Sequence, residues 1–125
     1  MAESRQQSLS LPRTSRIKQG RDFARVKARG NRIVYGCMIA NWLVHPAHAP
    51  TRIGVITSRK IGNAVKRNRA RRLLREVFRL HQHDFNQTLD MVLIARPSIA
   101  RKKMREVEAD FLTVLRRGGL LKKTE

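Results

Sequence analysis

The sequence predicts one α+β domain, a two-layer sandwich in which helices cover a β-sheet. Stretches with the apolar period of a helix alternate along the chain with short runs of β-branched residues. The length of 125 residues suits a single domain, which would bury about two-thirds of the surface of its unfolded chain. The single cysteine cannot form an internal disulfide, so an apolar core has to hold the fold together.

The N-terminal part is predicted to be a tail followed by a short helix. Residues 1–15 are polar and basic and have little to bury, which predicts a disordered basic tail. Asp22 stands where it can cap a helix, and Gly30 is suited to end it. Phe23 and Val26 fall on the inner face of that helix.

Three regions are typical of strands. Residues 33–44 are predicted to form strands with a break near Gly36, and prolines bracket the loop at 45–51. Residues 52–58 are β-branched and largely apolar, which predicts another strand. Residues 90–96 form an apolar run, which predicts a strand buried on both faces of the sheet.

The remaining elements are predicted to be helices. Residues 64–81 form the clearest one, with Asn63 as its N-cap, because the apolar residues fall on one arc at about 100° per residue. Residues 99–117 are predicted to form the last helix, which two glycines stop. The domain is therefore predicted to cover residues 16–118, followed by a frayed tail at 119–125.

The charge of the chain is large and one-sided. Lysine and arginine number 28 against 9 aspartates and glutamates, a net charge of +19. No acid lies between Phe23 and Arg75, although that stretch is rich in arginine. Solvated surfaces usually mix both signs, so the acid-free stretch predicts a binder of polyanions.

Several other classes of function fit the sequence poorly. No apolar run approaches the ~18–20 residues that span a membrane, and no secretory signal begins the chain, so a cytoplasmic protein without a membrane partner is expected. Metal-assisted hydrolysis needs converging carboxylates, which the central half lacks. The histidine pairs have no accompanying cysteine pair for zinc. No catalytic or metal-ligating residue is therefore predicted in the protein.

The densest cationic segment runs from Lys66 to Glu76 on the predicted helix 64–81. A solvated helix face would carry acids four residues from its arginines, and this segment holds only Glu76. Crowded like charges destabilise an isolated helix, and phosphates lying against it would offset that cost. Charge alone leaves three partners open: the RNA of an RNA enzyme, ribosomal RNA, and DNA that the protein would compact.

The sequence around this segment resembles the protein subunit of bacterial ribonuclease P. The family's hallmark is an Arg-Asn-Arg motif on a long helix, matched here by Arg67-Asn68-Arg69. Residues 59–66 before it, and Arg71-Arg72-Leu73, Arg75-Glu76 and Phe78 after it, agree in order and spacing. Arg16-Ile17-Lys18, Asp22-Phe23 and residues 90–97 also match, so the resemblance covers roughly residues 16–117.

The resemblance implies a fold and a mechanism. The fold would be α-β-β-β-α-β-α with a left-handed β-α-β crossover, whereas a right-handed one would be expected without the family. The catalyst would be the RNA subunit, which would bind most of the Mg²⁺, and the protein alone would be inactive. The protein would bind that RNA and the 5′ leader of precursor tRNA, raise the affinity for substrate and Mg²⁺ during endonucleolytic leader removal, and need no obligate protein partner.

The resemblance also assigns residues to two kinds of contact. The leader would bind between the first helix and the sheet, where a base could stack on Phe23 for ~1–3 kcal/mol. Lys27 stands where members often carry a second Phe, and Asn41 where some carry a tyrosine, so leader binding is expected to be more electrostatic here. Trp42 should point to the opposite face of its strand. The residues expected to bind RNA, either the catalytic RNA or the tRNA near the cleavage site, are Arg59, Lys60, Lys66, Arg67, Asn68, Arg69, Arg71, Arg72 and Arg75.

Overall fold

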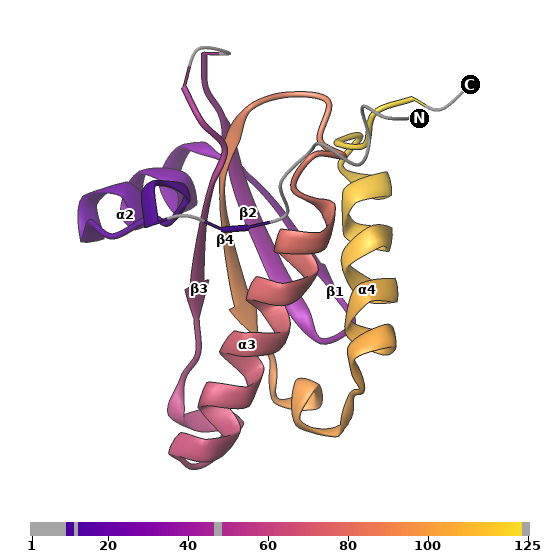
Figure 1. Cartoon of the computed structure of the whole chain (residues 1–125). Helices are drawn as coiled ribbons and strands as arrows, with labels where there is room; N and C mark the ends of the chain where they lie inside the picture. The colour runs from indigo at the N-terminus through magenta and orange to yellow at the C-terminus, as the bar shows by residue number, and fades with distance from the viewer. Residues whose placement is uncertain (1–9, 12, 47–48, 124–125) are drawn as a thin grey trace.

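The computed structural model describes residues 10–11, 13–46 and 49–123, and its elements follow the predicted order (Figure 1). The α+β prediction is confirmed: within the described residues, one four-stranded sheet is combined with three α-helices. The handedness of the crossover stays a prediction. The elements are η1 (Arg13–Ser15), α2 (Gly20–Arg29), β1 (Asn31–Tyr35), β2 (Met38–Val44), β3 (Arg52–Ile56), η2 (Arg59–Ile61), α3 (Ala64–His81), β4 (Leu89–Ala95), η3 (Pro97–Arg101) and α4 (Met104–Arg117).

The sheet has the strand order β1-β2-β4-β3. Strands β1, β2 and β4 pair antiparallel, whereas β3 pairs parallel to β4, and α3 connects these two strands. Strand β4 therefore lies inside the sheet, and all of its residues except the half-buried Ile94 are buried, as its apolar sequence predicts. Strand β3 lies at the edge of the sheet, which leaves one side of it open to other segments.

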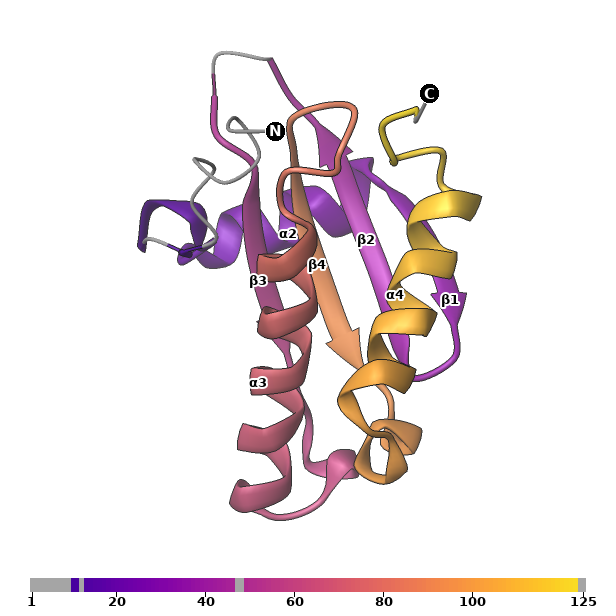
Figure 2. The ribbon, with the colours of Figure 1, turned by 45° about the vertical axis from the view of Figure 1, so that its right-hand side comes forward.

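The two faces of the sheet are covered by different helices. Helices α3 and α4 lie side by side over one face, and α2 crosses the other face (Figures 1 and 2). Trp42 on β2 belongs to the large core under α3 and α4. The preceding Asn41 is opposite Val92 in the ladder, and Val92 belongs to the smaller cluster with Val26 of α2. The predicted opposite orientation of Asn41 and Trp42 is thus confirmed.

Two predicted helix starts are wrong. Asp22 does not cap α2, which begins after Gln19; it lies in the first turn and is buried. The last helix begins at Met104 rather than at residue 99, because Lys102 and Lys103 have extended backbone conformations that interrupt it. The preceding Ile99 is buried from a 3-10 turn, so its apolar position resembles the helix period without belonging to α4.

Described residues near both termini pack on the domain. Within the predicted tail 1–15, residues 1–9 and 12 lie outside the described residues, whereas Leu11 packs on the core and Arg13–Ser15 form η1. At the other end, where the sequence predicts a frayed tail from residue 119, Leu120 is buried and Leu121 pairs with Phe85. Among the described helices, none combines the length and the apolar character needed to cross a membrane.

Candidate RNA-binding surface

Helix α3 presents the cationic residues because its other side is fixed in the core. Asn63 caps its start by accepting a hydrogen bond from the Lys66 backbone N–H at 3.0 Å, as predicted. Its buried residues, Ala70, Leu74, Val77 and Phe78, pack toward the sheet and α4. The 3.6-residue period then directs the intervening arginines away from the core.

The predicted RNA-binding residues form one surface along α3 and the η2 turn before it, called here the α3 surface. Arg67 and Arg71 are half-buried, and the other seven members are exposed. Within the described part of the chain, none of the nine has a carboxylate within ion-pair distance. Arg79, one turn beyond Arg75, differs, because its guanidinium contacts the Glu76 carboxylate at 2.6 Å. The positive charge of the α3 surface is thus left without internal compensation.

Three arginines of the α3 surface also hold the local structure. Arg67 donates to the Gly62 carbonyl at 2.6 Å, and Arg71 donates to Thr57 Oγ1 and to the Asn68 side chain. Arg69 donates to the carbonyls of Ile99 and Lys102 at 3.3 and 2.6 Å, which ties α3 to the segment before α4. A guanidinium has five N–H donors, so each keeps donors for a phosphate while its position is fixed.

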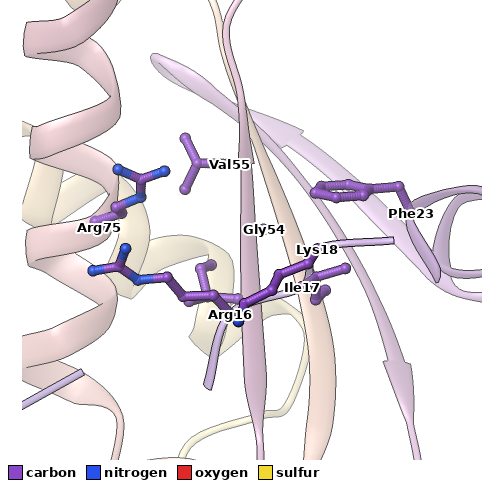
Figure 3. A pocket seen from close by; sticks show the side chains of 8 residues that line it. Arg16, Ile17, Lys18, Phe23, Gly54, Val55 and Arg75 are labelled. Carbon is purple, nitrogen blue, oxygen red and sulfur yellow. The ribbon is translucent and has the colours of Figure 1, made fainter. Parts of the chain in front are cut away.

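A cleft of about 380 Å³ lies at the edge of β3, and Arg75 of the α3 surface lines one side of it. Figure 3 shows Arg75 approaching the strand from α3, and Phe23 approaching it from α2 on the other side. A Cβ at Gly54 would lie only 2.4 Å from Phe23 Cε1, so the ring occupies the space that this glycine leaves. The cleft is lined by Arg16, Ile17, Lys18, Phe23, Ile53, Gly54, Val55 and Arg75.

Arg16 and Lys18 belong to the cleft although the sequence reasoning assigned them no contact. Arg16 pairs with Ile53 as an isolated parallel bridge, in which the Ile17 N–H donates to the Ile53 carbonyl at 2.8 Å. The segment therefore runs along the edge of β3 and brings both cations to the cleft. The resemblance of Arg16-Ile17-Lys18 to the family already pointed to this segment. Its position at the cleft, however, depends on the long-range bridge between Arg16 and Ile53.

Lys27 and Asn41, which were expected to contact the leader, do not line the cleft. Lys27 is exposed on α2. Asn41 is only 2% exposed, and its Nδ2 has no hydrogen-bond partner among the described residues. Of the three expected leader residues, the structure therefore brings only Phe23 to the cleft.

Arg52 lies in the acid-free stretch of the sequence, but it does not add to the unpaired charge. Its guanidinium contacts Asp90 at 2.6 Å and Asp22 at 3.6 Å, and both carboxylates are buried. The hydrogen bonds that Arg52 donates to Asp90 raise the pKa of Arg52 despite partial burial, and the charges of Asp90 and Asp22 add to the rise. The contacts of Arg52 with Asp22 and Asp90 connect α2 to the sheet at the residue before Phe23. Both aspartates lie outside the acid-free stretch of the sequence.

Comparison with known proteins decides the family. The family described as Ribonuclease P matches residues 11–119, which include the α3 surface and the cleft. The chain belongs to the ribonuclease P protein family. The resemblance drawn from the Arg-Asn-Arg motif is thereby confirmed, and with it the assignment to the ribonucleoprotein nuclease of tRNA processing.

Relatives and solved structures agree with this assignment. The ribonuclease P protein component of Geobacillus sp. strain WCH70 is 37% identical over 108 residues, covering 86% of this chain and 93% of that protein. That of Pelotomaculum thermopropionicum is 38% identical over 104 residues, covering 83% and 92%. The Staphylococcus aureus RNase P protein superposes with a TM-score of 0.78 at 26% identity, covering 86% of this chain and 98% of that one. The Thermotoga maritima protein gives 0.72 at 25% identity, covering 82% and 96%.

Proposed function

We propose that this ribonuclease P protein binds the catalytic RNA through the part of the α3 surface outside the cleft, and the 5′ leader of precursor tRNA through the cleft, which Arg75 lines. By holding both, it raises the affinity for substrate and for Mg²⁺ during endonucleolytic removal of the leader. The observation that carries the proposal is the uncompensated charge of the α3 surface directly beside a cleft that offers an aromatic ring. The proposed compartment is the cytoplasm, and no obligate protein partner is proposed.

The form of the α3 surface suits a folded RNA. The 18-residue helix is about 27 Å long, and the cations of the α3 surface lie in its N-terminal two-thirds, from Lys66 to Arg75. A row of this kind can neutralise several phosphates, and the release of their counterions supplies much of the binding free energy. Structured RNA offers such closely spaced phosphates.

The cleft has the parts expected of a site for a single strand. Phe23 is half-buried and packs against the cluster beneath α2, so its position is supported while the residue keeps exposed area. Arg16, Lys18 and Arg75 surround it with positive charge. Stacking on an aromatic ring combined with a cationic groove is the usual way in which proteins hold unpaired nucleotides.

The arrangement of the carboxylates in the described chain supports the proposal that the RNA, and not the protein, binds the catalytic metal ions. Each of them is already engaged by a cation, an imidazole or a backbone N–H, so they do not converge on a place for a metal ion. We therefore propose that Mg²⁺ is bound mainly by the RNA subunit and that the protein alone does not cleave. The engaged pairs are Asp22 with Arg25 and Arg52, Glu76 with Arg79, Asp84 and Glu108 with His81, Asp90 with Arg52, Glu106 with the Lys103 N–H, and Asp110 with Lys102.

The proposal is tested with two arginines of α3 that differ in their partners. Arg72→Gln removes an unpaired charge of the α3 surface, and Arg79→Gln removes a charge already paired with Glu76. Arg72→Gln should weaken binding to a bacterial ribonuclease P RNA and lower its salt slope by about 1, whereas Arg79→Gln should change both much less. Equal effects of the two variants would contradict the proposed surface.

Two further measurements separate the other partners that charge alone allows. A ribosomal protein would sediment with ribosomes at high salt, and a DNA-compacting protein would bind duplex DNA as tightly as structured RNA at physiological salt. Our proposal expects neither result.

A further inference from the structure

We propose that Arg16 and Arg75 together bind one phosphodiester of the 5′ leader at the open edge of β3. The proposal rests on the proposed function, and it gives Arg16 a role that the motif helix alone does not suggest. We call this pair the edge clamp. One arginine comes from the segment before α2 and the other from α3, so the leader would be held between the first helix and the α3 surface.

The backbone fixes the position of Arg16. The bridge to Ile53 aligns residues 16–18 with the edge strand, and Ile17 is buried in the cluster beneath α2. Side chains alternate along an extended segment, so Arg16 and Lys18 point away from that cluster. In Figure 3 the Arg16 side chain extends toward α3, on the same side of β3 as Arg75.

The two guanidiniums lie together without a carboxylate. Among the described residues, no aspartate or glutamate lines this cleft, and neither arginine has one within ion-pair distance. Partial burial lowers the pKa of Arg75, and the charges of Arg16 and Arg71 lower it further. The two positive charges repel each other, and an anion bound between them would be attracted to both and would offset that repulsion.

The neighbouring arginines show that acids are available close by. Arg52, two residues from Gly54 on β3, has Asp90 and Asp22, and Arg79, one turn from Arg75 on α3, has Glu76. Arg52 and Arg79 are thus paired with carboxylates, whereas Arg16 and Arg75 have none within ion-pair distance among the described residues. This contrast favours an external anion over a generally basic surface.

The rest of the cleft favours a phosphodiester of unpaired RNA over a free phosphate. Phe23 lines the same cleft on the other side of Gly54. An aromatic ring can stack on a base but would add little to the binding of an inorganic anion. The volume of about 380 Å³ lies in the range of roughly 300–1,000 Å³ that small-ligand sites occupy. A nucleotide would place its phosphate on the arginines and its base on the ring, whereas bases of a duplex are already stacked.

The test uses holoenzymes reconstituted with a bacterial ribonuclease P RNA. The dissociation constants are measured for precursor tRNA and for mature tRNA without a leader, using the unmodified protein, Arg16→Gln, Arg75→Gln and the double variant. Arg21→Gln is the matched control, because Arg21 is an exposed arginine of α2 that does not line the cleft. Arg16→Gln should weaken precursor binding about tenfold, the loss of one charge-assisted contact, and leave mature tRNA unchanged.

Two comparisons show whether the arginines share one phosphate. The double variant should lose much less leader affinity than the product of the two single losses, because each single change already breaks the clamp. A leader with a single neutral methylphosphonate at the bound position should reproduce the loss with the unmodified protein and add little with Arg16→Gln.

The contrary results are distinct. Unchanged precursor binding by Arg16→Gln, or multiplicative losses in the double variant, would overturn the edge clamp and leave the proposed function intact. If Arg16→Gln weakened binding to the catalytic RNA but left precursor tRNA binding by the holoenzyme unchanged, the edge clamp would also be overturned. Arg16 would then contact the catalytic RNA rather than the leader. Equal binding of precursor and mature tRNA by the unmodified holoenzyme would instead refute the proposed leader site, and the edge clamp with it.

Discussion

Gly54→Ala should disturb the leader site by displacing the ring of Phe23. The added Cβ would lie 2.4 Å from Phe23 Cε1 and 2.8 Å from Cζ, which is closer than van der Waals contact allows. Alanine itself suits a strand at least as well as glycine, so the cost comes from this contact. Overpacking of this kind costs about 1–3 kcal/mol of unfolding free energy.

A double-mutant cycle isolates the contact. In a Phe23→Ala background the nearest atom to the same added Cβ would be Ile17 Cβ, at 3.4 Å, which is ordinary contact. Gly54→Ala should therefore cost about 1–3 kcal/mol in the unmodified protein and close to zero after Phe23→Ala, as measured by urea unfolding.

The same variants connect the packing to function. Gly54→Ala and Phe23→Ala should each lower the affinity for precursor tRNA by the equivalent of about 1–3 kcal/mol of stacking, and leave mature tRNA unaffected. Equal costs of Gly54→Ala in both backgrounds would refute the placement of the ring. A displaced ring with unchanged leader affinity would refute its proposed role.

Three further predictions concern stability and reactivity. His81 is partly buried, which lowers its pKa, but hydrogen bonds to Asp84 and Glu108 outweigh this and raise it. Its contribution to stability should therefore be complete below the unfolded pKa of about 6.5 and be lost as pH rises through the folded pKa, and His81→Gln should flatten that dependence in urea titrations at several pH values. Asp90→Asn leaves Arg52 with only the more distant Asp22, so it should cost about 3 kcal/mol of unfolding free energy; a loss below about 0.5 kcal/mol would contradict a structural role for this pair. Burial and a hydrogen bond with Asp110 raise the pKa of Cys37 to about 12, so a thiol reagent at neutral pH should modify it only after unfolding, and rapid labelling of the native protein would contradict that.

The sequence predicted most elements because their apolar patterns are strong. The caps and period of α3 and the apolar run of β4 are local signals, and both elements appear where expected. The start of α4 was misplaced because Ile99 is buried from a turn, and period alone does not distinguish a turn from a helix. The C-terminal segment was expected to fray because its pairing with Phe85 lies far away in the sequence.

The site was predicted in part for similar reasons. The α3 surface follows from one helix and a recognisable motif, so its residues could be named in advance. The cleft depends on a bridge between Arg16 and Ile53, and on the space that Gly54 leaves for Phe23, which local patterns do not encode. Asn41 was assigned by position in the family, but in this chain it is buried under α2. Arg52 lies in the acid-free stretch, but acids distant in the sequence neutralise it in the fold.

The most direct test of the account is cleavage of precursor tRNA at low Mg²⁺ concentration. Three reactions are compared: a bacterial ribonuclease P RNA alone, the protein alone, and the two together. The account predicts that the combination cleaves at the end of the leader far faster than the RNA alone, and that the protein alone does not cleave. Cleavage by the protein without RNA, or the same rate with and without the protein, would contradict it.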